Sequence, residues 1–230
     1  MPTEALLLNR AVVFGSGVVY WAGVWVQARR VRRRIGGSTN SRPRGLKETL
    51  LWAGWLFVVG AWLGLPLLAR SGAGLPGLAI IPSLVHPVGR ALGIIMMGAG
   101  YLGTLWCYAA MGNAWRMGVN RAEKTDLVTR GPYRFVRHPI YVCQAVMVAA
   151  IAILLPSVLA LIILIIHLLC VLTKAADEES HLRALPGPTY EAYCARAGRW
   201  LPRLRKRAAP AAPLSAAKRD SLKAVEEPFK

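Results

Sequence analysis

Four long, mainly apolar stretches of this sequence contain no Asp, Glu, Lys or Arg: residues 11–28, 49–69, 91–115 and 138–173. A helix of about 17–25 apolar residues is long enough to cross a bilayer. The first three stretches therefore each predict one membrane-spanning helix. Hydrophobic residues make up 55% of the chain, above the roughly 45–50% of soluble domains, which also indicates an integral membrane protein.

The fourth stretch is too long for a single span. It has 36 residues and carries Pro156 near its middle, and proline interrupts a helix because it lacks an N–H group and clashes with the preceding turn. We therefore predict two helices that turn around Leu155, Pro156 and Ser157; one tilted, kinked helix is the alternative. The predicted fold class is an all-α integral membrane protein with about five transmembrane helices, the last two a helical hairpin, followed by cytoplasmic C-terminal helices.

The basic residues predict the orientation in the membrane. The chain has 29 Lys and Arg against 11 Asp and Glu, and basic loops stay in the cytoplasm. If the N-terminus lies outside, residues 29–47, 116–137 and 174–230 lie inside and contain 26 of the 29 basic residues. This arrangement needs an odd number of spans and so supports the hairpin. We expect an N-terminus outside, a cytoplasmic C-terminus and a bacterial inner membrane location.

The chain divides into three parts by composition. Residues 1–87 are an N-terminal region with two spans, residues 88–203 are a core with three spans and two polar segments, and residues 204–230 are a basic tail that we expect to be disordered. Because topology explains most of the positive charge, we predict membrane lipids as partners and no nucleic acid, and the sequence leads to no prediction of an oligomer. The cysteines indicate neither a disulfide framework nor a metal site: Cys107, Cys143, Cys170 and Cys194.

The polar segment between the third and fourth stretches is longer than a connector needs. It includes residues 112–118 and 126–141, which mix Gly, Pro, aromatic and basic residues. Arg137 and His138 stand where the next span begins, and Pro139 suits the first turn of a helix. The free backbone N–H groups of that helix start are therefore available to an anionic ligand.

A second polar segment follows the last span and contains three consecutive acids, Asp177, Glu178 and Glu179. Lys174 and Glu178 are four residues apart and share one helical face, and Glu179 shares a face with Arg183. Taken alone, both pairs can be explained as solvated ion pairs that contribute a few tenths of a kcal/mol to stability and have no function. The two polar segments gain significance because both are predicted on the same side of the membrane.

Together these segments resemble a known family. The resemblance rests on Arg130-Gly-Pro-Tyr-Arg-Phe-Val-Arg-His-Pro-Ile-Tyr141, followed by Glu178-Glu-Ser-His-Leu182, Gly187, Tyr190, Tyr193 and Trp200-Leu-Pro202. This pattern resembles the isoprenylcysteine carboxyl methyltransferases, integral membrane enzymes related to phospholipid methyltransferases. It covers about residues 88–203.

The resemblance implies methyl transfer from S-adenosylmethionine, bound in a cytoplasm-facing pocket, to a lipophilic acceptor that enters from the bilayer, first of all a carboxylate. It implies a cofactor pocket lined by Thr125, Asp126, Leu127, Val128, Tyr133, His138, Pro139, Ile140, Tyr141, Glu178, Glu179 and Tyr190. It implies a reaction centre with Lys174, Glu178 and Arg137. Lys174 stands where the family has Arg, so a point charge replaces a bidentate clamp.

The residue chemistry is compatible with this cofactor. Glu178 can accept from its ammonium or ribose groups, the helix start at Arg137 and His138 can take its carboxylate, and tyrosines can flank its adenine. An ionised acceptor needs no general base, so positioning and water exclusion can supply most of the rate.

Three other interpretations stay open. Methylation of a phospholipid amine or a small thiol tolerates Lys174 better than carboxyl methylation does. A nicotinamide-dependent membrane reductase of sterol-type lipids has a similar C-terminal architecture, and a non-catalytic scaffold would use the basic tail.

Overall fold

The computed structural model describes residues 2–35, 45–69, 77–115, 127–184 and 189–203. The α-helices are α1 (Pro2–Ile35), α2 (Leu46–Leu68), α3 (Pro87–Met111), α4 (Pro139–Leu154), α5 (Val158–Ala184) and α6 (Thr189–Arg196), and the 3₁₀ turns are η1 (Pro82–Leu84), η2 (Gly112–Ala114) and η3 (Gly131–Arg134). Within these ranges the β-structure consists of isolated bridging residues rather than strands. The predicted tail at 204–230 lies outside the described residues.

Four of the helices, α1, α2, α3 and α5, are long and apolar enough to cross a membrane, and α4 is a shorter apolar helix of 16 residues. The predicted all-α membrane protein is therefore confirmed. The first helix is longer than its charge-free stretch, residues 11–28. It has 34 residues, which extend roughly 50 Å at about 1.5 Å per residue. A hydrocarbon core is about 30 Å thick, so α1 is longer than one span needs, and its C-terminal part carries Arg29, Arg30, Arg32, Arg33 and Arg34.

The helical hairpin is also confirmed. Helix α4 ends at Leu154 and α5 begins at Val158, so Pro156 separates two helices and the single kinked helix is wrong. The Leu155 N–H donates to the Ile151 carbonyl at 2.8 Å and completes the end of α4. The Ser157 hydroxyl accepts from the Ala160 N–H at 3.2 Å and caps the start of α5.

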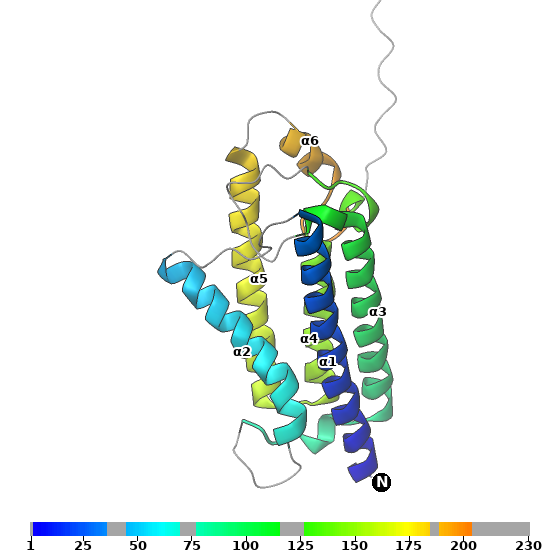
Figure 1. Cartoon of the computed structure of the whole chain (residues 1–230). Coiled ribbons are helices and arrows are strands. Elements are labelled where there is room, and N and C mark those ends of the chain that lie inside the picture. Colours follow the sequence, from blue (N-terminus) through cyan, green and yellow to red (C-terminus); the bar gives the residue numbers. More distant parts are fainter. Residues whose placement is uncertain (1, 36–44, 70–76, 116–126, 185–188, 204–230) are drawn as a thin grey trace, which may run out of the picture.

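The first and the last described residues lie at opposite ends of the bundle. Figure 1 shows the N-terminus at the bottom, whereas α6 and the last described residues lie at the top. At the bottom, the buried Asn9 side chain donates to the Leu154 carbonyl at 2.8 Å. Arg10 donates to the carbonyls of Pro66 and Leu67 at 2.5 and 3.1 Å, which satisfies acceptors at the C-terminal end of α2.

Helix α2 packs against α1 and α5, and Figure 1 shows its start inclined away from α1 at the upper end. Lower down the helices meet closely: the ring of Tyr20 stacks on Trp62 with centroids 5.4 Å apart, and both side chains are buried. The candidate site is a cavity lined by residues of α1, α2, α3, α4 and α5, described below.

Candidate active site

The loop before α4 is attached to the end of α3. Gly131 has a φ of 59°, in the left-handed region that favours glycine, and it begins the turn η3. The Arg130 guanidinium donates to the Ala110 carbonyl at 2.9 Å, and the Tyr133 hydroxyl contacts the Met111 sulfur at 2.9 Å. These contacts explain the Arg-Gly-Pro-Tyr sequence as a fixed turn that delivers the chain to the start of α4.

The segment after α6 is paired with the same loop. The Gly198 N–H donates to the Phe135 carbonyl at 3.0 Å, and the Gly198 carbonyl accepts from the Arg137 N–H at 2.7 Å. A side chain at Gly198 would overlap the Leu201 carbonyl, so this position requires glycine. The Tyr193 hydroxyl donates to the Tyr133 carbonyl at 2.7 Å. The two motifs, far apart in the sequence, therefore form one unit.

Glu179 is the centre of this unit. Its side chain is 5% exposed, and its Oε1 lies 3.1 Å from Nη2 of Arg137, 3.1 Å from Nε2 of His138 and 3.2 Å from Nε of Arg199. The other oxygen accepts from Arg183 at 3.3 Å, as the predicted i, i+4 pair requires. Glu179 therefore joins α5, the start of α4 and the C-terminal segment from a position behind the cavity described below.

Arg137 is committed to the same cluster. Its Nε and Nη2 donate to Glu179 at 3.2 and 3.1 Å, and its Nη1 donates to the Ala197 carbonyl at 2.9 Å. Its side chain lines the cavity, but all three guanidinium nitrogens have protein partners. Arg137 belongs to the predicted reaction centre, and in the structure its guanidinium binds Glu179 and the Ala197 carbonyl.

The adjacent acid, Glu178, has a different environment. It lines the cavity with 28% of its side chain exposed, and its Oε1 accepts from the Tyr141 hydroxyl at 2.6 Å. Its Oε2 lies 3.7 Å from Nδ1 of His138, beyond hydrogen-bond distance. This oxygen therefore remains available to a ligand donor.

His138 lies between the two acids. Its ring stacks on the ring of Tyr141, with centroids 5.8 Å apart and an interplanar angle of 16°. The ring of Trp200 is tilted by 38° to it, with centroids 5.4 Å apart. Burial lowers the pKa of His138 below its ordinary value, because the charged imidazolium loses solvation, and this effect exceeds the opposing effect of Glu179. The imidazole is therefore neutral at physiological pH.

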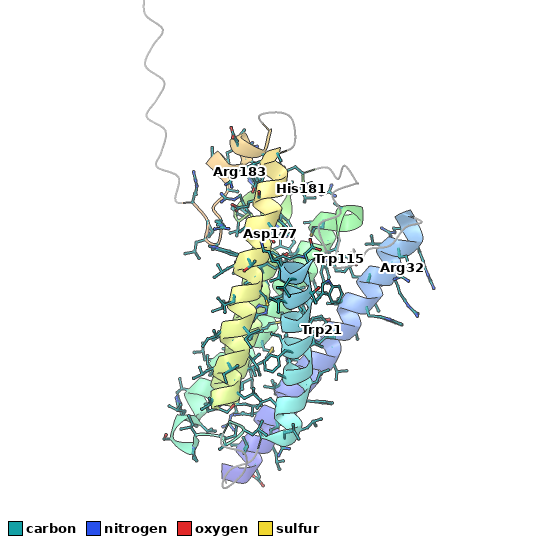
Figure 2. All side chains as sticks on the ribbon, turned by 90° about the vertical axis from the view of Figure 1, so that its left-hand side faces the viewer. Trp21, Arg32, Trp115, Asp177, His181 and Arg183 are labelled. Atoms are coloured by element: carbon teal, nitrogen blue, oxygen red, sulfur yellow. The ribbon has the colours of Figure 1, made fainter. Side chains whose placement is uncertain are left out.

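A cavity of about 430 Å³ opens beside these residues, a size within the range of small-molecule sites. Its polar end is lined by Tyr133, Arg137, His138, Tyr141, Lys174, Asp177 and Glu178, and its remaining wall by Trp21, Val24, Glu48, Leu51, Trp52, Trp55, Leu56, Val59, Tyr108, Met111, Trp115, Ile140 and Gln144. Figure 2 shows Asp177 and Trp115 near the upper end of α2 and Trp21 lower on α1. The same cavity is thus lined by a group of charged residues and by a mainly aromatic and aliphatic wall.

Sequence reasoning missed the contribution of α2. One face of this helix lines the cavity through Glu48, Leu51, Trp52, Trp55, Leu56 and Val59, which follow the i, i+3, i+4, i+7 spacing of a single helical face. The Lys47 ammonium pairs with Asp177 at 2.5 Å and joins the start of α2 to α5. The tryptophans that share a helical face with Glu48 could have indicated that this face lines a cavity. In a membrane span, however, apolar residues are expected on every face, so the pattern does not stand out.

The predicted site residues divide into three groups. Seven line the cavity together: Tyr133, Arg137, His138, Ile140, Tyr141, Lys174 and Glu178. Five lie near it but outside its lining: Pro139 is buried in the first turn of α4, Glu179 is buried in its ion-pair cluster, Val128 packs near Tyr133, and Leu127 packs with Tyr190 in the α6 cluster. Thr125 and Asp126 lie outside the described residues.

Comparison with known proteins agrees with the predicted relation. Residues 88–187 match the family model described as phospholipid methyltransferase. The chain is 27% identical over 113 residues to the nickel-cobalt-cadmium resistance protein NccN of Alcaligenes xylosoxydans xylosoxydans, which is 49% of each chain. It is 25% identical over 120 residues to the cobalt-zinc-cadmium resistance protein CzcN of Cupriavidus metallidurans, 52% of each chain. The matched part thus spans about half the length of these curated relatives.

Proposed function

Since residues 88–187 are related to the phospholipid methyltransferase family, we propose that this membrane protein transfers a methyl group from S-adenosylmethionine to a lipophilic acceptor. The observation that carries the proposal is a cavity that Glu178 and His138 line together with four tryptophans, Trp21, Trp52, Trp55 and Trp115. We further propose that the polar end faces the cytoplasm of a bacterial inner membrane, because most basic residues fall on that side of the predicted topology.

The donor set at the polar end fits the cofactor. Glu178 has an oxygen without a hydrogen bond from a described residue, suited to an ammonium or ribose hydroxyl. The first N–H groups of α4, at Ile140 and Tyr141, lack partners within the helix and suit a carboxylate. Tyr133 and Tyr141 offer rings to an adenine. When bound, the cofactor supplies an electrophilic methyl group.

The protein's own residues orient the acceptor and exclude water. The aromatic and aliphatic wall from α1 and α2 takes a hydrocarbon chain. Lys174 forms no hydrogen bond or ion pair with another described residue, and it lines the polar end, where its charge suits a carboxylate. The first acceptor class is therefore a lipid acid. Its carboxylate needs no general base, so positioning it beside the cofactor site can account for the rate of methyl transfer.

A second acceptor class is favoured by the charges around Lys174. Three carboxylates, Glu48, Asp177 and Glu178, line the same cavity. An acceptor carboxylate at this end also approaches the carboxylate of Glu178, which repels it. A lipophilic thiol or amine avoids that repulsion.

The names of the relatives connect them with metal resistance. Among the described residues, no group of three or more His, Cys, Asp or Glu side chains is placed to hold a metal ion. We propose that any effect on metal tolerance follows from the methylated product. A Glu178→Ala gene should then fail to restore the metal tolerance of a deletion strain.

The test uses the full chain purified in detergent. We expect labelled S-adenosylmethionine to bind, S-adenosylhomocysteine to compete and NADPH not to compete. Glu178→Ala should bind at least tenfold more weakly, since a hydrogen bond to a charged group contributes about 1.5–3 kcal/mol. Glu191→Ala, on the exposed surface of α6, is the matched control and should bind like the parent.

Turnover on a panel of lipid acids, thiols and amines identifies the acceptor class. Competition by NADPH would instead support the reductase. A parent that binds no S-adenosylmethionine, or a Glu178→Ala variant with unchanged affinity, would overturn the proposed function. Deletion of residues 204–230 should leave cofactor binding intact, whereas a scaffold that acts through its tail would lose its function.

A further inference from the structure

The two ring nitrogens of His138 face different partners. Nε2 lies 3.1 Å from Oε1 of the buried Glu179, whereas Nδ1 lies 3.7 Å from Oε2 of Glu178 and has no hydrogen bond to a described residue. His138 also lines the cavity proposed for methyl transfer. One nitrogen is therefore fixed by the protein, and the other is available at the reaction site.

The partner of Nε2 determines the tautomer. A carboxylate oxygen only accepts hydrogen bonds, and Oε1 of Glu179 already accepts two from Arg137. At 3.1 Å from that oxygen, Nε2 must be the nitrogen that carries the proton. Neutral His138 therefore presents the lone pair of Nδ1 toward Glu178 and the cavity.

A carboxylate that orients an imidazole, with the second nitrogen facing the reacting group, is the arrangement of histidine general bases. We propose that His138 is the general base of this methyltransferase and accepts the proton of a lipophilic thiol or amine acceptor. The inference rests on the proposed function and narrows its acceptor to a nucleophile that carries a proton until it is methylated. A carboxylate acceptor would leave this base without a role.

The step balances without any further reactant. The acceptor sulfur or nitrogen forms a bond to the methyl carbon, the bond between that carbon and the sulfonium sulfur breaks, and its electron pair stays on sulfur. The acceptor's S–H or N–H proton moves to Nδ1 of His138. Glu179 stabilises the resulting imidazolium through Nε2, and the proton later leaves to solvent.

The charged groups around His138 come from three elements. Glu178 and Glu179 of α5 favour the imidazolium, while Arg137 beside it and Arg199 of the C-terminal segment oppose it. Because burial adds to the effect of the arginines, the pKa of His138 lies below its ordinary value and the base is unprotonated before reaction. Tyr141 stacks on its ring, and Tyr133, Lys174 and Asp177 line the same cavity.

The first test does not depend on turnover. The chain has only four histidines, His86, His138, His167 and His181, so selective ¹⁵N-histidine labelling gives a small spectrum that single His→Gln variants assign. We expect His138 to be neutral at pH 7 with its proton on Nε2. A proton on Nδ1, or an imidazolium at that pH, would overturn the proposal.

The second test compares His138→Gln with the matched control His181→Gln. A glutamine amide retains a donor for Glu179 but cannot take up a proton. His138→Gln should bind S-adenosylhomocysteine within about threefold of the parent, while thiol or amine turnover falls by about 10²–10⁴-fold, the usual contribution of a general base. The control should keep both.

The results distinguish the failure of the general-base role from the failure of the proposed methyltransferase function. If cofactor affinity falls together with turnover, His138 is a cofactor ligand and the base role is wrong. If the parent methylates only lipid acids, and His138→Gln does so equally well, the base role is again wrong while the methyltransferase stands. A parent that binds no S-adenosylhomocysteine overturns both.

Discussion

Nη2 of Arg137 lies 3.1 Å from Oε1 of Glu179, so residues 42 positions apart form a buried ion pair beside the cavity. Both side chains are less than 10% exposed. Such a pair places strict demands on geometry, because an unpaired charge in this environment is costly. The pair fixes the end of α5 against the start of α4, and it thereby sets the positions of Glu178 and His138.

Removal of the central carboxylate should destabilise this end of the molecule. Glu179→Ala leaves Arg137 and Arg199 without their buried partner, and breaking a buried pair costs about 3–5 kcal/mol. We expect a lower melting temperature in detergent and loss of cofactor binding. Glu191→Ala on α6 should melt like the parent. Unchanged melting of Glu179→Ala would contradict the central role of this carboxylate.

The close approach at Gly198 predicts a strong effect of one methyl group. In Gly198→Ala the added Cβ would overlap the Leu201 carbonyl, so the C-terminal segment must shift away from Arg137 and Phe135. We expect a loss of about 1–3 kcal/mol, as for overpacked sites, measured by thermal unfolding. Gly64→Ala, where no atom lies within 4 Å of the new Cβ, is the control and should have little effect.

The lowered pKa of His138 predicts a pH dependence of stability. Between that lowered value and about 6.5, the unfolded chain binds more protons at this residue than the folded protein does. The free energy of unfolding therefore rises with pH across this window and falls on acidification. Melting temperatures measured from pH 5 to 8 should show this slope, and His138→Gln should reduce it. An identical slope in the variant would rule out His138 as its source.

Lys174 predicts a difference between acceptor classes. Lys174→Met keeps an unbranched apolar side chain at this position but removes the positive charge from the polar end of the cavity. We expect KM for lipid acids to rise about tenfold or more, while thiols and amines change little, because only a carboxylate depends on that charge. The measurement is steady-state turnover on each class. An equal loss on all classes would instead assign Lys174 to the cofactor or to folding.

Much of the fold is predictable from the sequence, and much of the site is not. The charge-free stretches and Pro156 predicted the helical segments and the hairpin, because charge in hydrocarbon and proline within a helix both cost free energy locally. The same local reasoning predicted Glu179 and Arg183 as an i, i+4 pair, which forms. The family resemblance gave Tyr190 the same role as Tyr141, yet of these two residues only Tyr141 lines the cavity.

What the sequence alone determined was therefore the set of helices and the two polar segments near the membrane surface. The tertiary structure decided how Glu178 and Glu179 differ: successive residues on a helix point about 100° apart, since each turn has about 3.6 residues. Packing directs the first toward the cavity and buries the second under Arg137, His138 and Arg199. Helix α2 joined the site for the same reason, because contacts between distant segments exist only once the helices have packed.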